Sequence, residues 1–412
     1  MTEKRIDWPA EAERIEGRLE LLGGISESDG GLDRPPFTRS LRRAMEETSR
    51  WMEEAGLLPA VDSFGNLLGR APQEGRKPAL LIGSHLDTVP NGGRFDGALG
   101  ILLGIAAAEI LLPRARELPF AVDVLAFQEE EGARFRSGCL GSRAFLGLLE
   151  SRDWALTDSR GLSLQEARDS FATDGWPRVE PYSREGIFGY LEAHIEQGPQ
   201  LEALGLPLGL VAGIVGQERL LFSFHGEGGH AGCVPMASRR DALGAAAEFA
   251  IFLEEMARQQ PGAVATVGEL HCRPGAVNVI PKQVDLSVDL RHPKDEVLDR
   301  LSHRLQERAR EIGKRRKIQV SSRRTDRLPA IGSDRGWRER LASTVGAIQG
   351  KAPQLWSGAG HDAGILGRFA PMVMLFLRCR RGISHDPAEF VSPPDIACAL
   401  QAMVGFVESF LP

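Results

Sequence analysis

The sequence predicts a two-part α/β protein. A discontinuous larger domain with a mostly parallel sheet and helices on both faces is interrupted by an inserted α/β domain with an antiparallel sheet. The chain has 412 residues, more than one hydrophobic core usually organises. Short apolar runs alternate with longer amphipathic stretches in its first half, as in βαβ units. Residues 284–290 instead alternate apolar and polar side chains one by one, which is typical of a sheet with one wet face.

The elements of the larger domain follow from its buried-strand runs. Ala79 to Ile82 and Val122 to Phe127 read as strands, and the segment from Gly97 to Leu112 between them reads as a helix. A helical crossover of this length is what a pair of parallel strands requires. Buried-strand character returns at Pro371 to Leu377. We therefore assign residues 1–213 and 329–412 to this domain, in which residues 151–188 contain no motif that we can interpret.

The pattern changes between residues 214 and 328, which we assign to the inserted domain. Leu220 to Phe224 reads as a strand, and Ser238 is expected to cap a helix that runs to about Arg258. The alternating strand at 284–290 follows, and a charged amphipathic helix is expected from about Lys294 to Lys314.

Composition narrows the function classes. A formal net charge of −6 and a pI near 5.9 give no electrostatic reason to bind nucleic acid or an anionic membrane. The N-terminal residues lack the apolar core of a signal peptide, and no apolar run approaches the roughly 20 residues of a membrane span. We expect a cytoplasmic protein. Its five scattered cysteines have no CxxC spacing, so we expect reduced thiols rather than disulfides or a thiolate zinc site.

Chemistry-bearing residues first gather where a buried strand is expected to end, at Gly83. The segment Ser84-His85-Leu86-Asp87 is followed by a glycine-rich turn that carries Asp96 and leads into a helix. Ligands of open α/β sheets bind in the crevice at such strand ends. A lone histidine is usually structural, but His85 shares its turn with acids, which favours a functional role.

Three consecutive glutamates follow the next strand. They stand in Phe127-Gln128-Glu129-Glu130-Glu131-Gly132, and adjacent carboxylates repel one another unless cations hold them. A solvated acidic loop is one interpretation. The other is that one glutamate binds a metal ion while its neighbour moves protons as general acid and base.

Two further histidines stand in unusual settings, His194 in AHIEQGP and His385 in GISHDP. Together with His85, Asp96 and Glu131 they would supply three imidazoles and two carboxylates, which suit zinc, manganese or cobalt. This set is sufficient for two ions about 3.5 to 4 Å apart if one carboxylate bridges them.

These motifs resemble the M20-type metal-dependent amidases, and within them the carbamoylase branch, over nearly the whole chain. The segments that carry the resemblance occur in family order: GSHLDTVPNGGRFDG, EEGARF, HIEQGP, GHAGCVPMASRRDA, GAVNVIP, SGAGHDA and GISHDPAE. The resemblance implies two divalent metal ions held by His85, Asp96, Glu131, His194 and His385. Asp96 would bridge the ions, and Glu130 would be the general base.

The resemblance also implies that the inserted domain forms a homodimer and closes as a lid over the substrate. His230 resembles a histidine that binds the polarised carbonyl oxygen, although a surface histidine is the alternative. Asn278 and Arg291 resemble substrate-binding positions, and a guanidinium matches a carboxylate geometrically. Arg291 could instead pair with Asp289 or Asp285. The residues Gln197, Gly360 and His361 match positions that line the family pocket.

The expected activity is hydrolysis of the terminal ureido group of a small carboxylate substrate, with release of ammonia and carbon dioxide. The stretch from Leu375 to His385, with its arginine-cysteine pair before GISH, resembles allantoate amidohydrolases. An N-carbamoyl-L-amino-acid hydrolase or β-ureidopropionase is the close alternative. A peptidase or aminoacylase, or a binding protein that has lost catalysis, are others. Manganese is the first expectation for the metal, and zinc, cobalt and nickel accept the same ligands.

Overall fold

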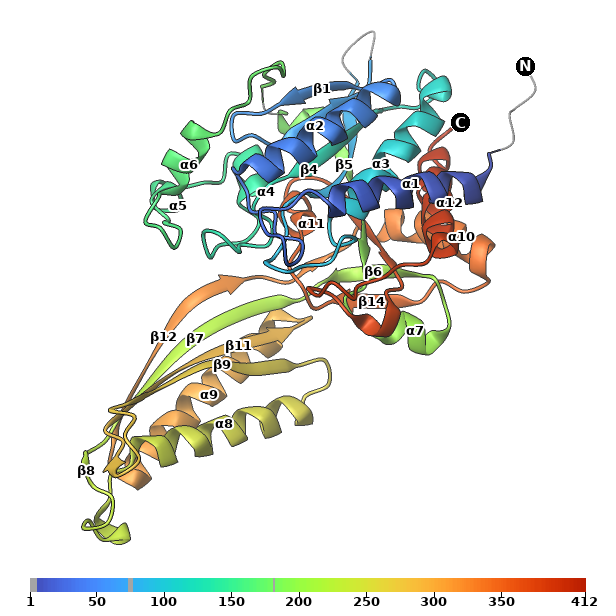
Figure 1. Cartoon of the computed structure of the whole chain (residues 1–412). Coiled ribbons are helices and arrows are strands. Elements are labelled where there is room, and N and C mark those ends of the chain that lie inside the picture. Colours follow the sequence, from blue (N-terminus) through green and yellow to red (C-terminus); the bar gives the residue numbers. More distant parts are fainter. Residues whose placement is uncertain (1–5, 73–76, 181) are drawn as a thin grey trace. The chain divides into compact units, whose positions relative to one another are not determined.

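The computed structural model describes residues 6–72, 77–180 and 182–412. It divides into two compact units, one formed by the described parts of Met1–Ala212 and Ser333–Pro412 and the other by Gly213–Gly332. Both are drawn in Figure 1. Among the described residues, no helix is long and apolar enough to cross a membrane. We refer to the first as unit 1 and to the second as unit 2.

Unit 1 is organised by a mixed sheet in which the described residues form nine strands. The order is β1-β2-β4-β3-β5-β15-β6-β13, with β14 paired to β6. The four central strands β4, β3, β5 and β15 run parallel, and antiparallel strands flank them on both sides. The strands are β1 (Leu58–Val61), β2 (Leu67–Arg70), β3 (Ala79–His85), β4 (Ala121–Phe127), β5 (Ile187–Ile195), β6 (Leu208–Ile214), β13 (Ile331–Gly332), β14 (Gln354–Ser357) and β15 (Met372–Leu377).

Helices cover both faces of this parallel centre. On one face Ile82, Val124 and Ala193 join a large apolar core with α1 (Trp8–Gly23), α3 (Ala98–Leu111), α10 (Arg335–Gln349) and α12 (Pro393–Glu408). On the other face α11 (Asp362–Leu366) contacts β5, β15 and α4 (Leu140–Phe145). Strands that are buried on both faces read as continuous apolar runs, which is why the sequence revealed them. The remaining helices of unit 1 are α2 (Arg39–Glu54), α5 (Ser151–Trp154), α6 (Leu164–Ser170) and α7 (Gln200–Leu204), with 3₁₀ turns at Leu112–Arg114, Arg184–Gly186 and Arg380–Gly382.

Helix α3 lies unusually close to the sheet because it contains glycines where it crosses the strands. A Cβ atom at Gly100 would overlap the carbonyl oxygen of Ala193, and one at Gly104 would lie 3.0 Å from Ile82 Cγ2. The helix is apolar almost all round, as expected of a helix buried between a sheet and other helices. Its N-terminus is thereby fixed beside the ends of β3 and β5.

The segment 151–188, which has no recognisable motif, has a packing role. Helix α6 contributes Leu164 and Ala167 to a small apolar cluster with Phe37, Phe64 and Phe135. Phe135 ends the EEGARF motif, and its backbone N–H donates to Glu129 Oε1 at 2.7 Å. This apolar cluster therefore supports the acidic loop through Phe135.

Unit 2 is a four-stranded antiparallel sheet with two helices on one face. The strand order is β12-β7-β11-β9, and alternate residues of β11 (Val284, Leu286, Val288 and Leu290) are buried in the core formed with α8 and α9. The elements are β7 (Gly216–His225), β8 (Gly229–His230), α8 (Ala242–Gln259), β9 (Val264–Arg273), β10 (Val279–Ile280), β11 (Gln283–His292), α9 (Asp295–Arg316) and β12 (Gln319–Leu328), with a 3₁₀ turn at Met236–Ser238. The predicted fold class is confirmed in both units.

Two local predictions were wrong. Ser238 does not cap α8, because it closes the preceding 3₁₀ turn, and the cap is Asp241, whose carboxylate accepts from the N–H groups of Leu243 and Gly244. Strand β3 does not end at Gly83 but continues through His85, because the ladder with β4 extends to the pair His85 and Phe127. The second difference fixes the His85 backbone inside the sheet rather than in a loop.

The helix cap gives a test of the fold. We expect Asp241→Ala to lower the free energy of unfolding by about 1 kcal/mol, because two N–H groups lose their acceptor. Ser238→Ala should change it by less than about 0.5 kcal/mol. Urea denaturation of both variants, followed by circular dichroism, makes the comparison, and equal losses would contradict the assignment of the cap.

Candidate metal centre

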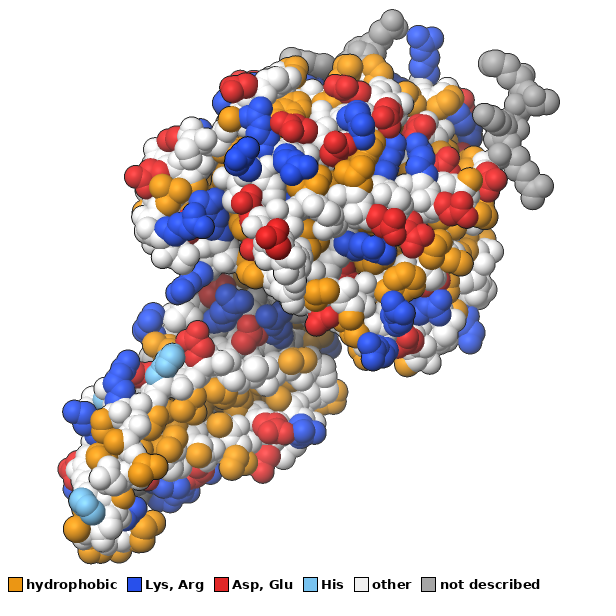
Figure 2. Space-filling model, viewed as in Figure 1, with side chains coloured by type: hydrophobic (Ala, Val, Ile, Leu, Met, Phe, Trp, Pro, Cys, Tyr) orange, Lys and Arg blue, Asp and Glu red, His pale blue; other side chains and the backbone are white. Residues whose placement is uncertain are grey.

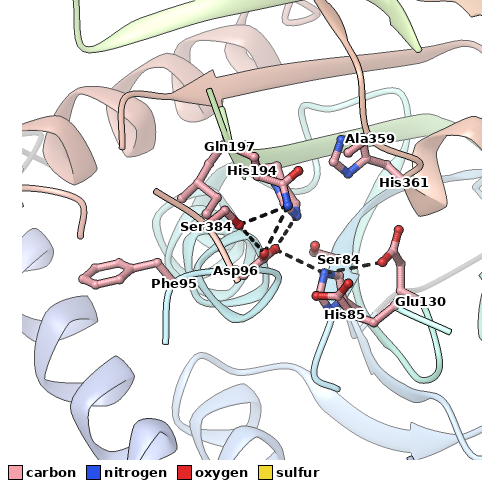
Figure 3. A network of polar contacts seen from close by, with 12 residues as sticks. Ser84, His85, Phe95, Asp96, Glu130, His194, Gln197, Ala359, His361 and Ser384 are labelled. Carbon is pink, nitrogen blue, oxygen red and sulfur yellow. Dashed lines mark hydrogen bonds and ion pairs between the residues drawn. The ribbon is translucent and has the colours of Figure 1, made fainter. Parts of the chain in front are cut away.

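The candidate ligands meet at one edge of the parallel sheet of unit 1. His85 ends β3, Glu130 and Glu131 follow β4, and His194 lies near the end of β5. His385 follows β15 after a 3₁₀ turn, and Asp96 precedes α3. Parallel strands bring their carboxyl ends to the same edge, which is where open α/β sheets hold ligands. Figure 3 shows most of these side chains pointing toward one another.

Asp96 is the centre of the cluster. Its Oδ1 lies 3.0 Å from His194 Nε2 and 3.6 Å from His85 Nε2. Its Oδ2 lies 3.4 Å from His385 Nε2, which in turn lies 3.4 Å from Glu131 Oε2. Each carboxylate oxygen therefore faces a different set of ligand atoms, His85 with His194 on one side and His385 with Glu131 on the other.

These separations fit metal ligands. Ligand atoms about 2.1 Å from a tetrahedral ion lie about 3.4 Å from one another, and the four separations above scatter around that value. Asp96 Oδ1 and His194 Nε2 are buried and face each other, and neither has a hydrogen-bond partner elsewhere among the described residues. Buried polar atoms are normally satisfied, so these two atoms point to a bound cation. The residues present fit a pair of divalent ions bridged by Asp96.

The backbone holds two of the imidazoles in the tautomer that a metal requires. His85 Nδ1 lies 2.9 Å from the carbonyl oxygen of Asp87, and His194 Nδ1 lies 2.9 Å from that of Ile195. A carbonyl can only accept, so each Nδ1 carries a proton, and Nε2 is the nitrogen left to bind a metal ion when the ring is neutral. A glycine is needed beside the first ring, because a Cβ atom at Gly97 would lie 2.5 Å from the His85 ring.

Asp87 organises the acidic loop. Its two carboxylate oxygens accept from the N–H groups of Glu130 and Glu131, each at 3.2 Å. Glu130 directs Oε2 toward His85 Nε2 at 3.9 Å, and Cys139 Sγ donates to its Oε1 at 3.6 Å. Glu130 belongs to neither ligand set around Asp96. Its carboxylate is therefore available for proton transfer beside the cluster.

The electrostatics of the cluster are those of several acids buried close together. Burial, followed by the charge of Asp96, raises the pKa of Glu131 to about 8. Burial also raises the pKa of Glu130 well above its ordinary value. For Asp96, burial alone would raise the pKa, but the charges of His194 and His85 outweigh it and hold the pKa well below the usual range. Bound cations would favour the ionised form of all three carboxyl groups.

Three other predicted pocket residues lie in unit 1. The Gln197 amide nitrogen donates to Asp96 Oδ2 at 3.1 Å and to Ser384 Oγ at 3.2 Å, so it touches the cluster directly. His361 is buried, its ring centroid lies 4.5 Å from that of His194, and its Nε2 lies 2.8 Å from Ser357 Oγ. Burial and the neighbouring His194 lower the pKa of His361 well below its ordinary value, which favours a neutral ring. Gly360 precedes His361 in the loop that leads into α11.

The other three predicted residues lie in unit 2. His230 is exposed in the short strand β8, which pairs with β10, and the N–H of Ala231 donates to the carbonyl oxygen of Asn278 at 2.9 Å. His230 and Asn278 are therefore neighbours. Arg291 lies on β11, and its Nε and Nη2 donate to the two carboxylate oxygens of Asp289 at 2.7 and 3.0 Å. Asp285, the other suggested partner, instead accepts from Arg273, Ser223 and Gln283.

Comparison with known proteins shows the family of this chain. The model of peptidase family M20/M25/M40 matches residues 81–409. The chain belongs to this family. An allantoate deiminase of Arabidopsis thaliana is 39% identical over 425 residues, covering 95% of this chain and 81% of the relative. An N-carbamoyl-L-amino acid amidohydrolase of Geobacillus stearothermophilus is also 39% identical, over 96% of this chain and 97% of the relative.

A solved structure of similar sequence shows the same fold. The hydantoinase/carbamoylase family amidase of Burkholderia ambifaria superposes with a TM-score of 0.85 at 33% identity, and the match covers 97% of this chain and 98% of that one. The predicted resemblance to the carbamoylase branch of the M20 family is therefore confirmed. Family membership and the His, Asp and Glu cluster together indicate a dinuclear site for divalent metal ions.

Several residues of the site carried no role in the sequence prediction. Asp87 was visible as an acid next to His85, but nothing local indicated that it would accept from the acidic loop. Ser384 donates to Asp96 Oδ2 at 2.9 Å, and Glu192 Oε1 accepts from Ser84 Oγ at 3.0 Å. Ser384 stands inside the GISH motif, so its place beside His385 was the available signal. Glu192 stands two residues before His194 in a strand, which places both side chains on one face of the sheet.

The acidic loop gives a pH-dependent prediction for metal-free protein. Burial and the charge of Asp87 raise the pKa of Glu129 to about 8, from an ordinary value of 4.5. The folded state therefore binds this proton more tightly than the unfolded chain. Its stabilising contribution is complete below about pH 4.5 and is lost as the pH rises toward 8.

We expect Glu129→Gln, which stays neutral and can still accept from Phe135 N–H, to be more stable than the parent protein at pH 8. Its loss of stability between about pH 5 and pH 8 should also be smaller. Urea denaturation of both proteins in a chelating buffer at the two pH values measures this difference. Identical pH dependence in the two proteins would contradict the shift.

Proposed function

We propose that this chain is a metal-dependent hydrolase that cleaves the terminal ureido C–N bond of a small carboxylate substrate, with allantoate as the first candidate. The observation that carries the proposal is the pair of ligand sets around Asp96, with the carboxylate of Glu130 buried beside them and outside both sets. A protein that only binds its ligand has no use for a carboxylate placed to move protons beside two cations. The named relatives in the M20 family act on allantoate or on N-carbamoyl-L-amino acids.

The chain supplies the groups that such a hydrolysis needs. His85 and His194 with Asp96 would hold one ion, and His385 and Glu131 with Asp96 the other. When bound, the two ions would lower the pKa of a water molecule and polarise the ureido carbonyl group. Manganese is the first metal to test, because carboxylate ligands suit it and imidazoles accept it as well as zinc, cobalt or nickel.

Glu130 would carry the proton through the reaction. Its carboxylate takes a proton from the attacking water and delivers it to the nitrogen of the departing ammonia. The C–N bond to the terminal nitrogen breaks and a C–O bond forms, which leaves a carbamate on the product nitrogen. The carbamate then loses carbon dioxide without assistance.

The residues of unit 2 would recognise the substrate. We assign His230 to the developing negative charge on the carbonyl oxygen and Arg291 to the substrate carboxylate, with Asn278 beside His230. A carboxylate bound by Arg291 would compete with Asp289, which also accepts from Gln217 Nε2 at 2.5 Å. Asp289 therefore keeps a second donor if Arg291 turns to a substrate.

We also propose that unit 2 forms a homodimer and closes over the substrate. Strand β9 is an edge of its sheet, and an unpaired edge can accept another strand. Figure 2 shows hydrophobic side chains along the α8 side of this unit. Ile251 on α8 and Val264 on β9 are 61% and 59% exposed, which is unusual for large apolar side chains. A cytoplasmic location remains part of this proposal.

The choice between allantoate and an N-carbamoyl-L-amino acid depends on an indirect signal. The arginine-cysteine pair that favoured allantoate makes internal contacts. Arg378 forms a two-point salt bridge with Asp395 of α12, at 2.9 and 2.8 Å, and Cys379 is buried. The pair would therefore influence the substrate pocket by shaping the chain before His385 rather than by touching a ligand.

The decisive assay is ammonia release by purified, manganese-loaded protein, with allantoate and a panel of N-carbamoyl-L-amino acids measured in parallel. We expect metal-dependent ammonia from allantoate and little from the panel, and a chelated sample serves as the control. Ammonia mainly from the panel would select the N-carbamoyl-L-amino-acid hydrolase. Ammonia from neither, with metal bound, would reject ureido hydrolysis of these substrates and favour a peptidase or a binding protein.

The role of Glu130 is tested by comparing adjacent glutamates. We expect Glu130→Gln to bind both ions and to fold normally while turnover falls by about 10²- to 10⁴-fold, the usual contribution of a general base. Glu129→Gln makes the same change one residue earlier, where the side chain accepts from the backbone instead, and should retain most of the turnover. Steady-state ammonia release with metal analysis measures both, and normal turnover in Glu130→Gln would reassign the base.

A further inference from the structure

Glu389 is a buried carboxylate that contacts the backbone of the central ligand. Its Oε1 accepts from the N–H of Phe95 at 2.8 Å and from the N–H of Asp96 at 2.9 Å. The side chain is 4% exposed. Two successive backbone N–H groups that converge on one oxygen form a small anion-binding concavity. The oxygen in this concavity belongs to Glu389, which stands 293 positions after Asp96 in the sequence.

The neighbouring backbone is shaped to admit this side chain. A Cβ atom at Gly93 would overlap the carboxyl group of Glu389, although the φ angle of Gly93 lies outside the left-handed region. Position 93 therefore needs glycine because the Glu389 carboxyl group lies so close to it, and not because of its backbone conformation. The ring of Phe390 adds an edge-on contact to Phe95, with centroids 5.8 Å apart.

Glu389 also belongs to the loop of another ligand. It stands four residues after His385, and its own N–H donates to the carbonyl oxygen of Asp386 at 3.0 Å. Ser384, on the other side of His385, donates to Asp96 Oδ2. The two loops are therefore joined at two points, at the Asp96 carboxylate by Ser384 and at the Asp96 backbone by Glu389.

We propose that Glu389 is a positioning residue that joins the Asp96 loop to the His385 loop and so sets how Asp96 is shared between the two ions. It belongs to none of the candidate metal-ligand groups of the described residues. Residues 94–97 lie in bends and turns outside the sheet, so no strand ladder fixes the direction of the Asp96 side chain. Glu389 fixes this backbone instead, because it accepts from the N–H of Asp96. The inference rests on the ligand set proposed above and does not depend on which substrate is hydrolysed.

The test is a metal titration of metal-depleted full-length protein with Mn²⁺ and with Zn²⁺, against a competing chromogenic chelator. We expect the parent protein to bind two ions. Glu389→Ala should bind the weaker ion about 10- to 100-fold less tightly, the usual effect of removing a group that orients a ligand. Glu389→Gln keeps a carbonyl oxygen that can accept from both N–H groups, and it should restore the affinity to within about threefold.

Gly93→Ala gives an independent route to the same result. The added methyl group displaces the Glu389 carboxyl group, so the variant should weaken the second ion as Glu389→Ala does. Gly346→Ala, at a helical position where a Cβ atom meets nothing within 4 Å, is the matched control. Asp241→Ala removes a carboxylate that accepts from two N–H groups in unit 2 and controls for a general loss of stability. Both controls should bind metal as the parent protein does.

The outcomes separate the two proposals. Wild-type affinity for both ions in Glu389→Ala and Gly93→Ala would overturn the role of Glu389 and leave the ligand set intact. Equal defects in Glu389→Gln and Glu389→Ala would also overturn it, because the accepted hydrogen bonds would then not be what matters. If the parent protein bound fewer than two ions, the ligand set would fail and this inference with it. A thermal melt of each metal-free variant identifies any that does not fold, and Glu389→Gln then decides the result.

Discussion

The rest of this structure depends on one constraint, which is that a buried aspartate presents its two oxygens to two different sets of ligand atoms. Asp96 faces His85 and His194 through Oδ1 and His385 through Oδ2. Several acids lie within the same few ångströms, and burying like charges close together is unfavourable. Two divalent ions would resolve this conflict, and the unsatisfied Asp96 Oδ1 and His194 Nε2 are where it is most evident. Such repulsion is tolerated in proteins where it serves a function.

The fold meets this constraint by fixing each ligand from the backbone. The strands β3, β4, β5 and β15 are parallel, so their carboxyl ends lie at the same end of the sheet. Ligand residues far apart in the sequence therefore lie close together. Carbonyl oxygens then hold the two imidazoles at their Nδ1 atoms, and Asp87 holds the loop of Glu130 and Glu131. Helix α3 can start beside His85 only because glycine stands at position 97. The arrangement leaves Glu130 next to the cluster without making it a ligand, which is what a proton carrier requires.

The choice of substrate is a separate matter from the metal chemistry. The named relatives divide between allantoate and N-carbamoyl-L-amino acids at the same 39% identity, so overall similarity does not discriminate between them. Arg378, part of the sequence signature for allantoate, is bound by Asp395. Arg291, the expected carboxylate receptor, is held by Asp289 in unit 2. The candidate metal ligands thus all lie in unit 1, while the proposed recognition residues are carried by a unit with its own core.

The sequence by itself predicted the fold class, because buried strands and amphipathic helices are local patterns. Its motifs resemble those of a known family, and that resemblance predicted the residues that gather around Asp96. The sequence-based prediction misplaced the cap of α8, since Ser238 and Asp241 are both good caps and only the 3₁₀ turn that ends at Ser238 decides which one is used. The tertiary structure alone decided how Asp96 divides its oxygens and that Arg378 pairs with Asp395 of α12. It also decided that Glu389 reaches the Asp96 backbone across 293 positions. Those contacts join distant segments, and no local periodicity records which distant segments a sheet will bring together.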